Sequence, residues 1–187
     1  RYGTAVGRAV HGVLQVVDLA TGDGLDDAAR AQAMAEGVAT RTEVVARLAR
    51  AGVESAVGRA AAATEHWREL WVAAPLGDAG EFLIEGYVDL LYRADGDGLV
   101  IVDWKTDQVD GDDDVTAKLE RYRLQGASYA AAVEAATGET VTSMVFVFLR
   151  EDGATEAELP DLRAAIAEVR TRAAELARES DTADARL

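Results

Sequence analysis

The sequence predicts an α/β domain in which helices precede a mixed four-stranded sheet and two further helices pack against it. Three observations support this fold class. Apolar residues recur with a helical period up to about residue 63. The segments between about residues 67 and 105 are instead rich in Val, Ile, Leu and aromatic residues, as strands are. A long helical pattern, a β-branched run and a second helical pattern follow.

The N-terminal part contains four predicted helices separated by turn-forming residues. Val and Leu form an apolar stripe on the first, which ends before a Gly-Asp-Gly turn. Asp26 or Asp27 can cap the second helix, and Gly37 and Gly52 are predicted to end the second and the third. The predicted helices span residues 5–19, 26–36, 42–51 and 55–63.

Three strands are predicted next, and their short connections indicate an antiparallel meander. The tetrapeptide Asp95-Gly96-Asp97-Gly98 between the second and third is typical of a hairpin turn. The sequence does not fit a calcium-binding loop here, because Leu99 and Thr106 occupy positions that require oxygen ligands. The predicted strands span residues 67–74, 81–93 and 99–105.

The C-terminal part is predicted to add a helix, a fourth strand and a last helix, at residues 115–137, 141–149 and 159–178. Gly138 ends the long helix. A helix between the third and fourth strands allows these two strands to be parallel, which makes the sheet mixed. No linker or repeat divides the chain, so residues 1–179 are predicted to form a single domain and residues 180–187 a frayed tail.

Composition restricts the function. The chain has 187 residues and a formal net charge of -15, which opposes free-standing binding to nucleic acid, because phosphate contacts come from Lys and Arg. The acidic runs at residues 23–27, 110–114 and 151–158 lie in predicted loops and helix starts. A bound metal would cancel charge locally, and a partner domain could supply a basic track for the nucleic acid.

Several kinds of site are excluded by what the sequence lacks. Cysteine is absent, which excludes disulfides, thiolate zinc sites and iron–sulfur clusters in this segment and fits a cytoplasmic protein. There is no apolar run of ~20 residues that could span a membrane. No phosphate-binding P-loop is present, so nucleotide hydrolysis of that kind would need another domain. The chain begins at Arg1 and not at methionine, which indicates a piece of a longer protein.

Two acids and a lysine on neighbouring predicted strands point to metal-dependent phosphodiester cleavage. Asp103 and Lys105 are two residues apart, so on a strand they project from the same face, and Asp89 on the preceding strand can lie beside them. Such a cluster on a sheet face is costly unless something binds it. A divalent cation held by oxygen ligands is the expected occupant.

The ordered set of motifs resembles the PD-(D/E)XK nuclease superfamily, and specifically the RecB/AddA-like C-terminal nuclease domain of UvrD/RecB-type helicase–nucleases. The resemblance covers residues about 7 to 130 and implies a restriction-endonuclease-like core. Trp104 stands where relatives carry tyrosine, and its side chain is predicted to face away from the acids. The motifs are Gly7-Arg8-Ala9-Val10-His11, Gly86-Tyr87-Val88-Asp89, Asp103-Trp104-Lys105-Thr106 and Gln125-Gly126-Ala127-Ser128-Tyr129.

The resemblance assigns roles to these residues. It implies that His11, Asp89 and Asp103 bind Mg²⁺ or Mn²⁺, and imidazole suits Mn²⁺ better. It implies that Lys105 acts on the attacking water and the phosphate. Gln125 and Tyr129 share one helix face and would support the lysine and contact DNA.

Further charged residues are weaker candidates. Glu69 resembles a glutamate found upstream of the Gly-x-x-Asp motif in such domains. Glu85 lies four residues before Asp89 on the same predicted strand, so strict alternation places Glu85 and Asp89 on one face. Either glutamate could contribute a ligand. Lys118 and Arg121 precede Gln125 on its helix and are candidate phosphate contacts, whereas His66 fits no motif.

The sequence therefore predicts a metal-dependent DNA nuclease of the exonuclease type, part of a cytoplasmic helicase–nuclease in double-strand break repair and recombination. Its partners would be single-stranded DNA or duplex ends and a helicase domain in the same or another chain. The alternative is a catalytically decayed nuclease-fold module with a structural or DNA-guiding role. A toxin or restriction enzyme of the same fold is a third interpretation.

Overall fold

The computed structural model describes residues 4–76, 82–94, 96 and 98–184, and its centre is one five-stranded sheet in the order β1-β2-β3-β4-β5. Neighbouring strands are antiparallel except β3 and β4, which are parallel and joined by a helical crossover. The mixed α/β fold class and the crossover are as predicted. The strands are β1 (His66–Leu76), β2 (Phe82–Arg93), β3 (Leu99–Lys105), β4 (Val141–Arg150) and β5 (Gly153–Glu158).

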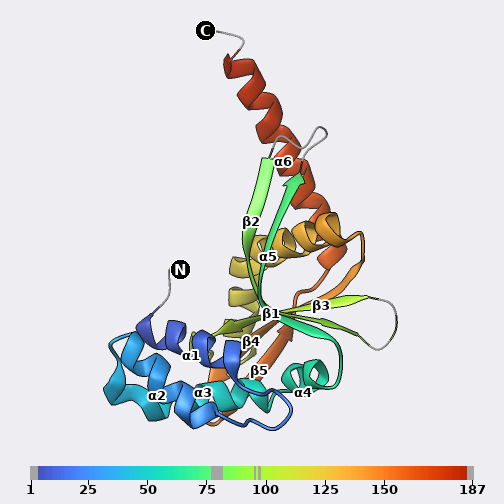
Figure 1. Ribbon diagram of the computed structural model, residues 1–187. Coiled ribbons are helices and arrows are strands. Elements are labelled where there is room, and N and C mark those ends of the chain that lie inside the picture. Colours follow the sequence, from blue (N-terminus) through green and yellow to red (C-terminus); the bar gives the residue numbers. More distant parts are fainter. Residues whose placement is uncertain (1–3, 77–81, 95, 97, 185–187) are drawn as a thin grey trace.

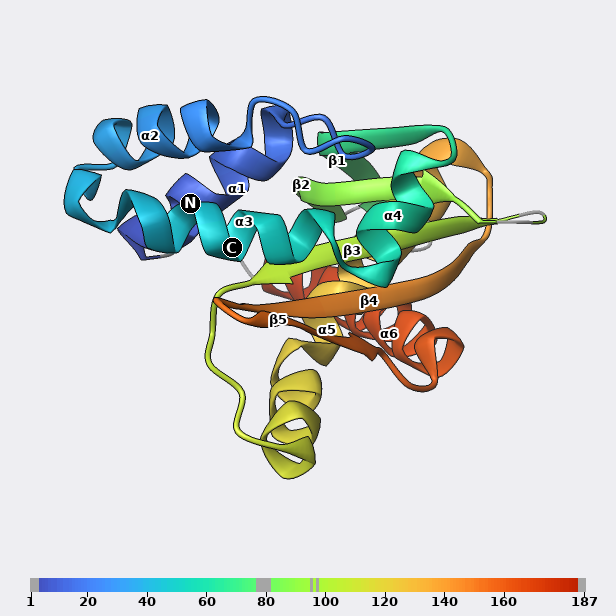
Figure 2. The same ribbon diagram turned by 90° about the horizontal axis from the view of Figure 1, so that it is seen from below.

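Helices cover both faces of the sheet, with α1 to α4 on one side and α5 and α6 on the other (Figures 1 and 2). Thr4 and Ser55 begin α1 and α4 as N-caps, each accepting a hydrogen bond from a backbone N–H three residues on. Within the described residues, no helix combines the length and the apolar character needed to cross a bilayer. The helices are α1 (Ala5–Val16), α2 (Leu25–Ala35), the 3₁₀ turn η1 (Ala39–Arg41), α3 (Thr42–Val53), α4 (Ala56–Ala62), α5 (Asp112–Thr137) and α6 (Leu162–Asp184).

Two apolar cores lie on the two sides of the sheet. The first joins α1, α2, α3 and α4 to the sheet through side chains such as Leu90, Val102 and Trp104. The second joins α5 and α6 to the opposite face, through residues such as Ile101 and Phe146. Trp104 thus faces away from its neighbours Asp103 and Lys105, as alternation along β3 requires.

The prediction of four strands is wrong, because β5 adds a fifth at the edge of the sheet. Its sequence, Gly-Ala-Thr-Glu-Ala-Glu, has almost none of the β-branched and aromatic residues that mark strands. The segment is extended because the turn at Glu151 and Asp152 folds it back on β4, where pairs from Val145↔Glu158 to Arg150↔Gly153 form. Tertiary pairing therefore overrides its local propensity.

Some predicted boundaries also change. Gly52 does not end α3, because it lies inside the helix where α1 approaches closely: a Cβ there would lie 3.0 Å from the Leu14 side chain. Helix α6 continues to Asp184, past residue 178 where the last predicted helix ends. Residues 185–187, and Asp95 and Asp97 of the predicted hairpin turn, lie outside the described residues.

The β1–β2 pair changes face at one point. Arg68 pairs with Leu90 and Leu70 with Val88, so Glu69 lies opposite Asp89. Glu69 has a positive φ of 49°, a left-handed conformation that is uncommon for a residue with a side chain. Strict alternation would place Val88 and Leu90 on one face, yet Val88 belongs to the core beneath α5 and Leu90 to the core beneath α1.

Strands β2 and β3 separate at the same place. They pair only from Arg93↔Leu99 to Leu90↔Val102, so Asp89 and Asp103 are the first residues beyond the paired ladder. Strand β3 continues beside β4 to Lys105. The backbone on the β2 side of β3 is therefore left without a strand partner where the two acids lie.

The packing predicts very different costs for one substitution at two positions of β2. Leu90 is almost completely buried in the first core, whereas Leu83 is exposed. We expect Leu90→Ala to lower the free energy of unfolding by about 2–5 kcal/mol, because it leaves a cavity. Leu83→Ala should change it by less than about 0.5 kcal/mol. Urea unfolding followed by circular dichroism measures both values, and equal losses would contradict the described packing.

Candidate active site

His11 is brought to the sheet by the close approach of α1 to the end of β3. A Cβ on Gly7 would lie 2.9 Å from Oγ1 of Thr106, so a larger residue would push the first turn of α1 away. One turn later, Nε2 of His11 lies 3.0 Å from the carbonyl oxygen of Trp104. Since a carbonyl only accepts hydrogen bonds, Nε2 carries a proton and Nδ1 points toward the acids.

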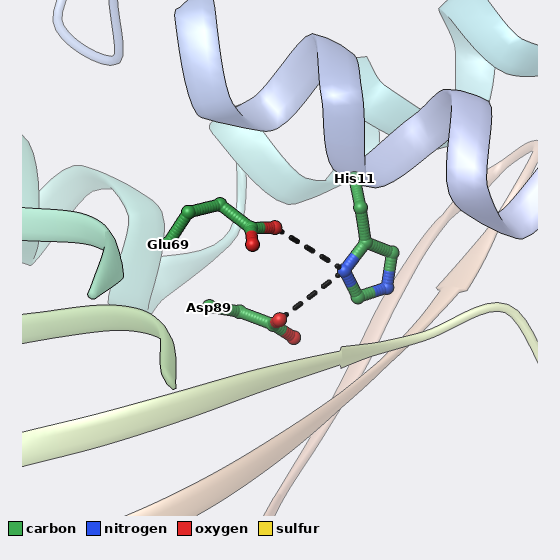
Figure 3. Close-up of side chains that lie close together, drawn as sticks. All are labelled: His11, Glu69 and Asp89. Carbon is green, nitrogen blue, oxygen red and sulfur yellow. Dashed lines mark ion pairs between the residues drawn. The ribbon is translucent and has the colours of Figure 1, made fainter. Parts of the chain in front are cut away.

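Asp89 is held by the backbone N–H of Trp104, the residue whose carbonyl oxygen faces His11. The backbone N–H of Trp104 donates to Oδ2 of Asp89 at 2.9 Å, which replaces the strand partner lost where β2 separates. The second oxygen, Oδ1, lies 3.2 Å from Nδ1 of His11 (Figure 3). The amide and carbonyl of Trp104 thus orient the carboxylate and the imidazole toward each other.

Glu69 completes a group of three potential metal ligands. Its Oε1 lies 3.9 Å from Nδ1 of His11, on the same side as Asp89 (Figure 3). One ligand atom from each of His11, Glu69 and Asp89 lies within 4.8 Å of the others. The residue with the left-handed backbone, Glu69, thus belongs to this group. Strained backbone is often found at functional sites.

Asp103 and Lys105 form an ion pair beside this group, with 2.9 Å between Oδ2 and Nζ. Asp103 is buried, and among the described residues its Oδ2 has no partner with hydrogen-bond geometry. The ion pair is short but poorly aligned, so this oxygen keeps unused capacity to accept. A buried carboxylate oxygen of this kind is costly unless a cation or a donor reaches it.

Two side chains of α5 contact the amino group of Lys105. Oε1 of Gln125 lies 3.4 Å from Nζ, and the centre of the Tyr122 ring lies 4.2 Å from it. The ring face attracts the ammonium group, and the Tyr122 hydroxyl donates in turn to Asp107. Sequence reasoning missed Tyr122, although its position three residues before Gln125 places it on the same helix face.

Gln125 and Tyr129 are linked to each other and to β2. The Gln125 amide donates to the Tyr129 hydroxyl at 3.2 Å. The Tyr129 ring packs directly on Gly86, where a Cβ would lie 2.8 Å from the ring. Gly86 of the Asp89 motif and Tyr129 of the Gln125 motif therefore form one contact between β2 and α5.

Charge and burial shift the pKa values of the central groups. Burial alone would lower the pKa of His11, but the charge and hydrogen bond of Asp89, with the charges of Asp103 and Glu69, raise it to about 9. Burial and the Asp89 charge raise the pKa of Asp103 to about 7, although Lys105 opposes them. Burial also acts to raise the pKa of Asp89, but His11, the Trp104 amide and Lys105 outweigh it and hold the pKa below its ordinary value.

The structure brings most of the residues selected from the sequence into one region, but groups them differently. His11 and Asp89 lie together with Glu69, while Asp103 pairs with Lys105 next to Gln125. Glu85 is exposed, and it is not part of the group that His11, Glu69 and Asp89 form. Lys118 and Arg121 lie on preceding turns of α5.

The donor set fits a divalent cation. Two carboxylates and an imidazole with its Nδ1 directed inward provide oxygen and nitrogen ligands, and the unused oxygen of Asp103 lies nearby. The hydrogen bonds from Trp104 orient Asp89 and His11 as outer partners orient ligands in metal sites. The region can therefore hold a cation beside a lysine.

Comparisons with known proteins agree with this geometry. Residues 2–186 match the PD-(D/E)XK nuclease superfamily. The chain is 36% identical over 172 residues to an ATP-dependent helicase/nuclease protein of Desulforudis audaxviator, and the match covers 81% of this chain and 14% of that protein. It is 41% identical over 73 residues to the protein of the same name from Carboxydothermus hydrogenoformans, covering 39% of this chain and 6% of that protein.

The raised pKa of His11 predicts a pH-dependent stability of the metal-free protein. The folded-state pKa of about 9 exceeds the ordinary value of 6.5, so the ion pairs of His11 stabilise the fold fully below pH 6.5 and are lost as the pH rises through 9. In EDTA, we expect the free energy of unfolding of the parent to fall between these values relative to His11→Gln, by on the order of 3 kcal/mol. Parallel pH profiles from urea unfolding would contradict this.

The geometry also separates two glutamates that the sequence could not. Glu69 lies in the three-residue group, whereas Glu85 is exposed on the outer face. We expect Glu69→Gln to weaken Mn²⁺ binding by at least about tenfold and Glu85→Gln to leave it unchanged. Calorimetric titration measures both, with an Asp89→Ala, Asp103→Ala double variant as the baseline. Equal affinities of the two glutamine variants would remove Glu69 from the site.

Proposed function

Because this chain belongs to the PD-(D/E)XK nuclease superfamily, we propose that it hydrolyses phosphodiester bonds in DNA as the nuclease domain of a helicase–nuclease. The observation that carries the proposal is the pairing of two features at the point where β2 leaves β3. One is the acid and histidine group of His11, Glu69 and Asp89, and the other is the buried Asp103–Lys105 pair next to it. A lysine beside carboxylates that can bind a cation is suited to assist the attack of a water molecule on a phosphate.

The metal in this proposal is Mg²⁺ or Mn²⁺. His11, Glu69 and Asp89 would hold it, with Asp103 as a further oxygen ligand, and the imidazole would favour Mn²⁺. When bound, such a cation polarises the scissile phosphate and lowers the pKa of a bound water. The chain itself supplies the positions of these ligands through the Trp104 amide and carbonyl.

Lys105 has the central role among the residues outside the metal group. Its ammonium group orients the attacking water and stabilises the negative charge that develops on the phosphate. Gln125 and the Tyr122 ring hold this amino group in place, and Tyr129 supports Gln125. We also propose that Gln125 and Tyr129 contact DNA, and that Lys118 and Arg121 on preceding turns of α5 contact its phosphates.

The larger protein is inferred from the relatives. The chain spans about one seventh of the curated relative that it matches over most of its own length. We assign to the whole protein a helicase that delivers DNA ends to this domain, with exonuclease-type digestion in double-strand break repair and recombination. The net charge of -15 supports this dependence, because the basic track for DNA would have to come from the helicase.

Cleavage of linear single-stranded DNA tests the proposal and the role of Lys105. We expect the chain to cut in Mg²⁺ or Mn²⁺ but not in EDTA. Lys105→Ala should lower the cutting rate by about 10²–10³-fold, because a charge that acts in the transition state is lost. Arg30→Ala removes an exposed positive charge from α2, outside the site, and should retain the cutting rate within about threefold.

Two results would argue against this assignment. A Lys105→Ala protein that cuts as fast as the parent would exclude the role of the lysine. Absence of cutting by the parent, both alone and within the full-length protein, would favour the decayed module with a structural or DNA-guiding role. Closed circular DNA serves as the control for end dependence, because an exonuclease leaves it intact.

A further inference from the structure

Two aromatic side chains face solvent close to the site. Trp71 of β1 and Tyr87 of β2 are directly opposite each other in the antiparallel register, and their residues are 55% and 51% exposed. Directly opposite side chains on antiparallel strands are close enough to form one continuous surface. Leu83, which is 63% exposed, extends this surface along β2.

The surface exists because the hairpin changes face at Glu69. Beyond Glu69, Val72 and Val88 face α5 and are buried. Side chains alternate along a strand, so their neighbours Trp71 and Tyr87 face the opposite side. Helices α1 to α4 pack against the part of the sheet before the change, and the hairpin extends past α1 with α5 on its other side (Figure 1). The aromatic pair therefore lies on the side of the sheet from which α1 approaches.

The pair is immediately next to the acid and histidine group. Trp71 is two residues beyond Glu69 along β1, and Tyr87 is two residues before Asp89 along β2. Two residues of a strand span about 7 Å. A nucleotide strand with a phosphate at the group would therefore extend over the two rings.

We propose that Trp71 and Tyr87 form a stacking subsite for the unpaired bases of a single DNA strand whose phosphate lies at His11, Glu69 and Asp89. This inference rests on the proposed nuclease function and gives it a substrate class. Stacking on an aromatic ring contributes to the binding of every base, because every base has a π-face. Bases in a duplex are already stacked and paired, so the subsite selects single strands.

The charge of the region favours contacts to bases over contacts to phosphates. The chain has a net charge of -15, and the exposed carboxylate of Glu85 lies on the same outer face as Tyr87. Phosphates are repelled by such a surface, whereas stacking does not require positive charge. A strand held here by its bases would keep its backbone away from Glu85.

A protein domain is a less suitable occupant of this surface. A domain seated on Trp71 and Tyr87 would come within about 7 Å of Glu69 and Asp89 and would close the approach to the metal group. A single nucleotide strand covers the same rings and leads directly into that group. The position of the rings relative to the acids therefore favours the strand.

Binding of fluorescein-labelled oligo(dT) in Mn²⁺, measured by anisotropy, tests the subsite, with the parent and every variant carrying Lys105→Ala so that cutting is slow while a cation can receive the phosphate. We expect Trp71→Ala and Tyr87→Ala each to weaken binding by about tenfold, the loss of one stacked base. Leu83→Ala is the matched control, because it removes another exposed apolar side chain of the same surface that has no ring, and it should bind as the parent does. The parent should also bind oligo(dT) more tightly than an abasic strand of the same length, and both ring variants should reduce that difference.

The possible outcomes separate this inference from the nuclease assignment. Parent-like binding by both ring variants would overturn the subsite, and so would an equal loss in Leu83→Ala, which is expected of a domain contact surface. Tighter binding of a dT·dA duplex than of oligo(dT) would overturn it as well. Metal-dependent cutting that survives any of these results would leave the nuclease function standing, whereas stacking without cutting would support the subsite alone. Circular dichroism of each variant verifies folding.

Discussion

The separation of β2 from β3 beyond the Leu90–Val102 pair is the constraint on which the rest of the site depends. A backbone amide left without a strand partner must find another acceptor. At Trp104 that acceptor is the side chain of Asp89, and the Trp104 carbonyl accepts from His11. Because the Trp104 ring is buried in the core beneath α1, its backbone N–H and carbonyl are held in fixed positions. They orient the Asp89 carboxylate of β2 and the His11 imidazole of α1.

Electrostatic balance follows from this arrangement. Glu69, Asp89 and Asp103 gather negative charge in a partly buried space, which is unfavourable unless cations compensate it. In the metal-free protein the compensation comes from Lys105 and from a histidine whose pKa is raised to about 9, while burial and Asp89 raise the pKa of Asp103 to about 7. In the proposed metal-bound state, a cation that replaces the proton on His11 would relieve the same repulsion.

The change of face at Glu69 has two structural effects. It places a carboxylate in the group with His11 and Asp89, and it turns Trp71 and Tyr87 outward beside that group. Past this point α5 covers one face of the hairpin, through Tyr129 packed on Gly86, and on the other face Trp71, Leu83 and Tyr87 are exposed. One local departure from regular strand geometry thus relates the proposed metal ligands to the proposed base-binding surface.

The sequence by itself determined the order of the elements other than η1 and β5, the limits of β3 and the crossover to β4, because these follow from local periodicity and connection length. It also selected His11, Asp89, Asp103, Lys105, Gln125 and Tyr129, which the fold brings into one region. Only the tertiary structure decided that β5 is a strand, that Glu69 and not Glu85 joins the group, and that Tyr122 lies under Lys105. These outcomes depend on pairing with β4, on a left-handed residue and on contacts across the sheet, which no local pattern specifies.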